Sequence, residues 1–177
     1  TPLRQLTARV TAAPVHLFAP QLATRFRWNK NTDTPLPQEE PAGQNPPDGA
    51  LIHYFLRAPA RGPVVLEILD GAGALVRPEP PGPGRNIPDY WIRPPRRLEA
   101  TAGLHRFVWD LHYPPPAVER FTYPIAAIYR NTPRVPMGPW VLPGRYTVRL
   151  TVDGQTLEQP LDVRMDPRVT TSRADLE

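Results

Sequence analysis

The chain has 177 residues, 40% of them hydrophobic, which is enough for one domain with a sizeable buried core plus extra loops. Its net charge of +4 arises from 21 basic and 17 acidic residues that are interspersed along the chain, so no nucleic-acid partner is predicted. There is no cysteine, which excludes disulfides, thiolate catalysis and cysteine-bound zinc, and no stretch approaches the roughly 18 apolar residues of a membrane span.

Proline is the most unusual feature of the composition, with 27 residues. Most of the prolines fall between alternating apolar runs, which predicts a folded β domain with long, Pro-rich loops. Lys30 is the single lysine, and so strong a preference for arginine is typical of a GC-rich bacterial genome. The absence of cysteine is compatible with the periplasm or an extracellular setting, and the expected localisation is secreted or periplasmic in a bacterium.

Residues 1–49 are predicted to form an N-terminal extension or linker. Their apolar pattern is weak and is interrupted by Pro14 and Pro20, although a short strand is expected at residues 24–28. Residues 29–49 are rich in prolines, turn formers and charges, as expected of a linker or long loop.

From residue 50 onward the sequence shows the period-two alternation of half-buried strands. Strands are predicted, in chain order, at residues 51–57, 63–70, 74–76, 104–111, 145–152 and 155–165. Two long loops, at 77–98 and 112–143, separate them.

Three local signals refine this reading. Asp153-Gly154 is the strongest hairpin signal, because a type I′ turn needs positive φ at both positions. Pro160 lacks an amide donor, which places its strand at a sheet edge or marks a bulge. In the C-terminal tail, residues 168–177, a helix is expected to begin after Thr171 or Ser172 as N-cap.

About six short strands without helical periodicity indicate an all-β fold. We predict an immunoglobulin-like or fibronectin-III-like β-sandwich over residues 50–167, with long Pro-rich loops and an extended N-terminal segment. The ring of Trp109 is expected to fill the core between the sheets.

Several motifs resemble known families. VVLEILDGAGALV at 64–76, AGLHRFVWD at 102–110 and LPGRYTVRL at 142–150 resemble the immunoglobulin-like domain of the flagellar hook-capping type. A second likeness covers nearly the whole chain. It is to the region that follows the Asp-box (BNR) β-propeller in bacterial sortilin-type proteins of the glycosyl hydrolase kind, and it rests on TPLRQL, LFAPQLATRFRW, QNPPDGALIHYFL, FVWDLHYP and PLDVRMDPRV.

This likeness implies an accessory role. In that family TPLRQL is the exit from the last propeller blade, and residues 50–167 are an accessory immunoglobulin-like domain. No Asp-box motif (S-x-D-x-G-x-x-W) occurs in the sequence, so the propeller is expected outside this chain. The resemblance thus implies a non-catalytic domain whose partner is the β-propeller of the same parent protein, and any glycoside hydrolase activity belongs to the parent.

Residue types that carry catalysis or bind metals are not grouped in the sequence. A glycosidase needs two carboxylates roughly 5–10 Å apart, whereas Glu39 and Glu40 are adjacent in a Pro-rich loop. Ser172 is the single serine and stands outside any G-x-S-x-G turn. The four histidines show no metal-binding spacing. We therefore predict no catalytic residue, metal or cofactor in this chain.

Aromatic residues on the two long loops are the predicted contact residues. Such rings either fasten a loop to the sandwich or to a neighbouring domain, or stack on a sugar. The candidates for carbohydrate or interdomain contact are Tyr90, Trp91, Tyr113, Phe121, Tyr123 and Trp140.

Three hypotheses of function remain open at this point. The first is an accessory domain that packs on and supports a β-propeller, with the two long loops as contact elements. The second is a carbohydrate-binding module that uses Tyr90, Trp91, Tyr113 and Trp140. The third is a fragment that completes a hydrolase active site with a loop residue, for which Arg93 and Glu119 are the candidates.

Overall fold

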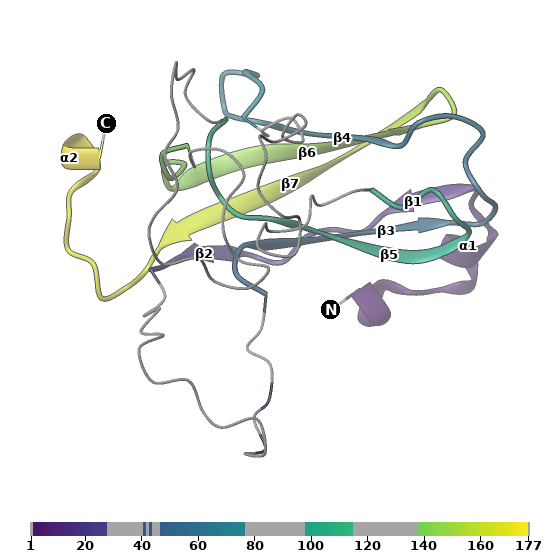
Figure 1. Ribbon diagram of the computed structural model, residues 1–177, viewed down its shortest axis with the longest axis horizontal. Helices are drawn as coiled ribbons and strands as arrows, with labels where there is room; N and C mark the ends of the chain where they lie inside the picture. The colour runs from purple at the N-terminus through teal and green to yellow at the C-terminus, as the bar shows by residue number, and fades with distance from the viewer. Residues whose placement is uncertain are drawn as a thin grey trace, which may run out of the picture.

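The computed structural model describes residues 2–27, 41, 43, 47–76, 98–114 and 138–176. This part of the chain is mostly β, as the sequence predicts, with three short helical segments (Figure 1). In chain order its elements are η1 (Pro2–Gln5), α1 (Ala8–Ala12), β1 (Val15–Leu17), β2 (Ala23–Arg25), β3 (Ala50–Leu56), β4 (Val65–Leu69), β5 (Gly103–Trp109), β6 (Gly144–Val152), β7 (Gln155–Met165) and α2 (Arg173–Leu176).

The strands form two sheets that face each other (Figure 1). One sheet has three antiparallel strands in the order β1-β3-β5. The other has four strands in the order β2-β7-β6-β4, in which β2 runs parallel to β7 and the other pairs are antiparallel. The four-stranded sheet is curled, so that its end strand β2 contacts β3 of the opposite sheet.

The core lies between the sheets and is built from the inward residues of each strand. On β3 these are Ile52, Tyr54 and Leu56, as the alternation predicts. Trp109 is also buried, as predicted, with only 1% of its surface exposed, and its ring packs edge-on against Tyr146 with the centroids 5.5 Å apart.

The local signals at the C-terminal end of the chain are confirmed. Asp153 and Gly154 have φ values of 47° and 82°, and they join β6 to β7 as the predicted tight turn. Pro160 of β7 pairs with Thr147 of β6. On the other side of β7, the described part of β2 pairs only with residues 163–165, so the missing amide donor of Pro160 lies at a free edge. The Ser172 hydroxyl accepts a hydrogen bond from the Asp175 amide and caps α2.

The predicted return of the chain at 74–76 is found as the beginning of an antiparallel pairing. Leu75 forms a bridge with Leu69 of β4, and the Val76 amide donates to the Ile68 carbonyl at 2.8 Å. The Asp70 carboxylate accepts hydrogen bonds from the amides of Ala72 and Ala74 at 2.9 and 2.8 Å and so holds the turn between the two segments. The residues that follow Val76 lie outside the described part of the chain.

The N-terminal segment supplies two strands where the sequence predicted one. β1 pairs with β3, and β2 pairs with β7, so this part of the predicted extension is integral to both sheets. Leu17 and Ala23 are core residues. Gln5 fastens η1 to the chain beyond β1, because its side-chain amide bonds both the carbonyl and the amide of Ala19, at 2.9 and 3.0 Å.

Candidate functional site

The structure describes two of the six predicted contact aromatics, Tyr113 and Trp140. The other four, and both hydrolase-loop candidates, lie outside the described residues: Tyr90, Trp91, Phe121, Tyr123, Arg93 and Glu119. The proposal that these loop aromatics contact a sugar stays a prediction.

Tyr113 and Trp140 are brought together by backbone pairing between two segments that are distant in sequence. β5 ends where Leu111 takes a φ of 59°. Beyond this point the Tyr113 amide donates to the Pro139 carbonyl, and the Val141 amide donates to the Leu111 carbonyl, each at 2.9 Å. Trp140 is thereby placed directly opposite His112.

The Trp140 ring is half-buried and contacts two polar side chains of the protein. The His112 ring lies 4.2 Å from it between centroids, tilted by 36°, and the Arg25 guanidinium carbon lies 5.8 Å from the ring centroid. Arg25 also donates from Nη1 to the Val141 carbonyl at 3.0 Å. Burial lowers the pKa of Arg25, although an arginine stays charged throughout the physiological range. We call Arg25, His112, Tyr113 and Trp140 the Trp140 cluster.

The Trp140 cluster has the contacts of a packing element. Tyr113 and Trp140 both pack against the hydrophobic core. His112 is 7% exposed, its Nδ1 lies 2.7 Å from the Asp110 carbonyl, and its own carbonyl accepts from Trp109 Nε1 at 3.3 Å. The contacts of Trp140 with His112 and Arg25 are those of a ring that fastens a loop, and stacking of Tyr113 or Trp140 on a sugar stays a prediction.

Comparisons with known protein families, with curated proteins and with solved structures found no match. Within the described residues no group of three or more His, Cys, Asp or Glu side chains is placed to hold a metal ion. None of the helices described is long and apolar enough to cross a membrane.

The outer face of the four-stranded sheet is mainly polar, with Val65 of β4 as an exposed apolar residue on it. β6 presents Arg145, Thr147, Arg149 and Thr151 outward, opposite the outward residues Asp162, Pro160, Glu158 and Thr156 of β7. Arg149 bonds Glu158 at 2.7 Å and lies 3.8 Å from Glu67 of β4. The hydrogen bond to Glu158 raises the pKa of Arg149. This is the charged, solvated face expected of an antiparallel sheet that buries only one side.

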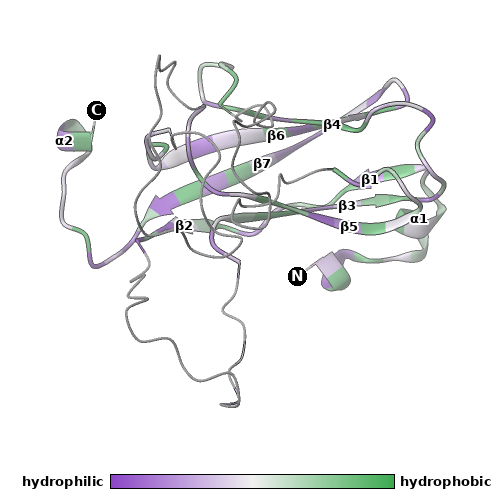
Figure 2. Ribbon diagram, viewed as in Figure 1, coloured by the Kyte–Doolittle hydropathy of each residue, from purple (hydrophilic) through white to green (hydrophobic). Residues whose placement is uncertain are grey.

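The outer face of the three-stranded sheet is different. Its outward cross-strand pairs between β3 and β5 are Leu51 with Val108, His53 with Arg106, and Phe55 with Leu104. In Figure 2 β3 is coloured largely as hydrophobic, whereas β7 ends in a hydrophilic stretch. Leu104 is 44% exposed and the other three apolar residues are half-buried. We call Leu51, Phe55, Leu104 and Val108 the outer apolar face.

A histidine–arginine pair lies in the middle of this face. Arg106 donates from Nε to His53 Nε2 at 3.0 Å, so Nε2 is unprotonated and His53 is neutral. His53 is 8% exposed, and its burial together with the positive charge of Arg106 lowers its pKa. His16 of β1 lies next to Phe55 on the same sheet, and burial lowers its pKa as well.

We expect the stability of the domain to fall on acidification below the ordinary histidine pKa of 6.5. The unfolded chain binds a proton at His53 more readily than the folded chain does, so the contribution is fully present above 6.5 and is lost as pH falls towards the lower folded value. Urea unfolding on both sides of this pH measures the slope. The variant His53→Gln should show a shallower slope that retains the His16 contribution, and an unchanged slope in this variant would contradict the assignment.

Proposed function

We propose that this chain is an immunoglobulin-like, non-catalytic accessory domain of a larger secreted bacterial protein. In this proposal the domain packs against a neighbouring β-propeller through its outer apolar face and holds it in place. The sortilin-type likeness of the sequence motifs suggests the kind of partner, and the contrast between the two outer faces suggests the contact surface.

The strand order supports an immunoglobulin-like fold. In immunoglobulin-like domains strands A, B and E lie in one sheet and strands C, F and G lie in the other. The order β1-β3-β5 corresponds to A, B and E, and the order β7-β6-β4 corresponds to G, F and C, with β2 added beside β7. The connections between these strands follow the same sequence order as in that fold.

A hydrogen bond at the start of β6 supports the same fold. The Tyr146 hydroxyl donates to the Leu142 carbonyl four residues upstream, at 2.6 Å. This is the geometry of the tyrosine corner, which in immunoglobulin-like domains lies near the beginning of strand F. The bond fixes the Pro143-Gly144 turn to the beginning of β6. The LPGRY motif therefore contains both ends of this hydrogen bond, Leu142 and Tyr146.

The observation that carries the docking proposal is the apolar character of the three-stranded sheet's outer face. Two of its three outward cross-strand pairs are purely apolar, Leu51 with Val108 and Phe55 with Leu104, whereas the opposite sheet presents charged pairs. Apolar residues gathered on one outer face mark a protein contact more often than scattered single ones do, and here two apolar pairs flank one polar pair. The polar pair of His53 and Arg106 in the middle supplies a point where an interface gains directional specificity.

A pair of substitutions tests the docking surface. The DNA that precedes the codon of Thr1 is read, the adjoining domain is expressed, and its affinity for this chain is measured by calorimetry. Leu104→Arg should weaken association at least about tenfold, because it places a charge on an apolar contact. Val65→Arg is the matched control, since Val65 is 41% exposed on the other sheet, and it should change the affinity less than about twofold.

Two results would overturn the proposal. One is that no β-propeller adjoins this chain, and the other is that Leu104→Arg and Val65→Arg have equal effects on association. Circular dichroism of both variants serves as the folding control, because each replaced side chain lies outside the core cluster.

A further inference from the structure

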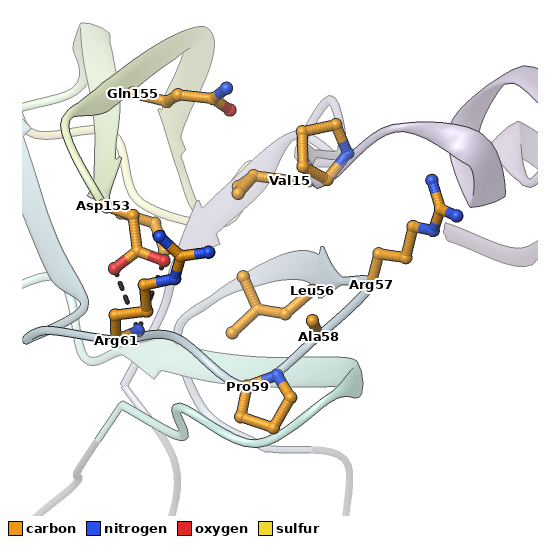
Figure 3. Close-up of a pocket in the computed structure, with 10 residues that line it drawn as sticks. Val15, Leu56, Arg57, Ala58, Pro59, Arg61, Asp153 and Gln155 are labelled. Atoms are coloured by element: carbon orange, nitrogen blue, oxygen red, sulfur yellow. Dashed lines mark hydrogen bonds between the residues drawn. The ribbon is translucent and has the colours of Figure 1, made fainter.

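A pocket opens at the end of the domain where the β6–β7 hairpin approaches the start of β1 and the end of β3 (Figure 3). Its volume is about 310 Å³, at the lower end of the range for small-molecule sites. It lies at the opposite end of β6 from the Trp140 cluster and on neither outer face of the sheets. Its lining residues are Pro14, Val15, Leu56, Arg57, Ala58, Pro59, Arg61, Val152, Asp153 and Gln155.

The interior of the pocket is aliphatic and rigid. Val15 of β1, Leu56 of β3 and Val152 of β6 line it, so three strands from both sheets contribute. Leu56 and Val152 are each 1% exposed and belong to the hydrophobic core. The pocket is thus an opening onto the edge of the core, and its wall is formed by side chains that are already fixed by packing.

One guanidinium faces the pocket, that of Arg61, whereas the guanidinium of Arg57 is bonded outside it (Figure 3). The Arg57 amide donates to the Pro14 carbonyl at 3.0 Å, and its Nη1 donates to the Ala12 carbonyl at 3.2 Å, so this residue is anchored to the segment that leads into β1. Figure 3 shows the Arg61 guanidinium between Asp153 and Val15. Arg61 forms no ion pair with an acidic side chain of the described residues, although its backbone amide is bonded.

The acid in the pocket is occupied by backbone donors. The Asp153 carboxylate accepts from the Arg61 amide at 3.0 and 3.2 Å and from the Gly62 amide at 3.1 Å. Both carboxylate oxygens of Asp153 thus accept hydrogen bonds from the backbone of residues 61 and 62. The Arg61 guanidinium therefore remains as the group in the pocket that can bind an anion.

We propose that this pocket binds a carboxylate attached to a short apolar group. A guanidinium presents paired N–H donors that match the two oxygens of a carboxylate, while the aliphatic wall takes the apolar group out of water. An inorganic anion would use Arg61 without the aliphatic wall, and an uncharged apolar molecule would use the wall without Arg61. The same chemistry occurs in a free branched-chain acid and in the C-terminal leucine of a peptide.

The test is a titration of the full chain followed by amide NMR, with isocaproate as the probe. Saturable shifts of the Arg61, Gly62 and Gly154 amides are expected with isocaproate, and binding of isocaproamide or inorganic phosphate should be at least about tenfold weaker. Acetylated peptides ending in leucine, with a free or an amidated C-terminus, form a second arm. Binding of isocaproate points to a small acid as the ligand, and binding of the free-carboxylate peptide alone points to a chain terminus.

Three variants make the result specific. Arg61→Gln should weaken binding about tenfold, while its backbone bond to Asp153 is retained. Ala58→Trp should block the pocket without altering the core, since Ala58 is exposed. Arg145→Gln is the matched control, because this arginine is exposed on the outer face of β6, and it should bind as the unmodified chain does. Equal binding of isocaproate and isocaproamide, or no binding of either carboxylate probe, would overturn the proposal.

Discussion

Replacing Trp109 by alanine is expected to lower the free energy of unfolding by about 3–5 kcal/mol. The indole is 1% exposed, packs on Tyr146 and donates to the His112 carbonyl, so the change leaves a cavity and an unpaired carbonyl at the end of β5. Small domains have a total stability of about 5–15 kcal/mol, and this single change removes a large part of it. Urea denaturation followed by far-ultraviolet circular dichroism measures the loss.

Trp140→Ala is the comparison for this experiment. Trp140 is half-buried at the edge of the same core, so its removal should cost clearly less than removal of Trp109. Equal losses for the two variants would show that the Trp140 cluster belongs to the core proper, and a loss below about 1 kcal/mol for Trp109→Ala would contradict its central position.

Gly49→Ala is expected to destabilise the domain by at least about 2 kcal/mol. Gly49 precedes β3 with a φ of +119°, and a Cβ there would lie 2.0 Å from the Trp109 carbonyl oxygen and 2.8 Å from its carbonyl carbon. Both are backbone atoms of β5 that cannot move aside as a flexible side chain does. The first pair of the β3–β5 ladder, Ala50 with Trp109, would have to separate.

Gly144→Ala controls for the loss of glycine itself. A Cβ at Gly144 meets no atom within 4 Å, and its φ lies outside the positive region. Its effect should be neutral, or stabilising by about 0.4–1 kcal/mol, because the unfolded chain loses freedom. If Gly49→Ala matched Gly144→Ala in urea midpoint, the close approach of Gly49 to β5 would be refuted.

The longer strands could be predicted because alternation shows clearly over seven or more residues. β3, β6 and β7 follow the predicted ranges within a residue or two, and Asp153-Gly154 specifies its own turn. The three-residue strands β1 and β2 are too short to alternate recognisably, and their existence depends on partners far along the chain. The return at 74–76 was predictable as well, because Asp70 and Gly73 form the turn that leads into it.

The candidate surfaces were harder to predict than the strands. Arg25 and Val141 are 116 residues apart, so no local sequence pattern indicates that Arg25 joins the rest of the Trp140 cluster. The pocket likewise collects residues from Pro14 to Gln155. The outer apolar face did leave a signal, because Leu51 and Phe55 are apolar at positions where a solvated strand face would be polar.

The parallel pairing of β2 with β7 has a mechanical consequence. β2 lies near the beginning of the described chain and β7 near its end, and they pair from Ala23 with Val163 to Arg25 with Met165. Tension applied to the two ends would slide these parallel strands along each other, so their hydrogen bonds would be loaded together rather than broken one at a time. This part of the fold is therefore loaded in shear, in contrast to an antiparallel hairpin, whose bonds are loaded one at a time when its ends are pulled apart.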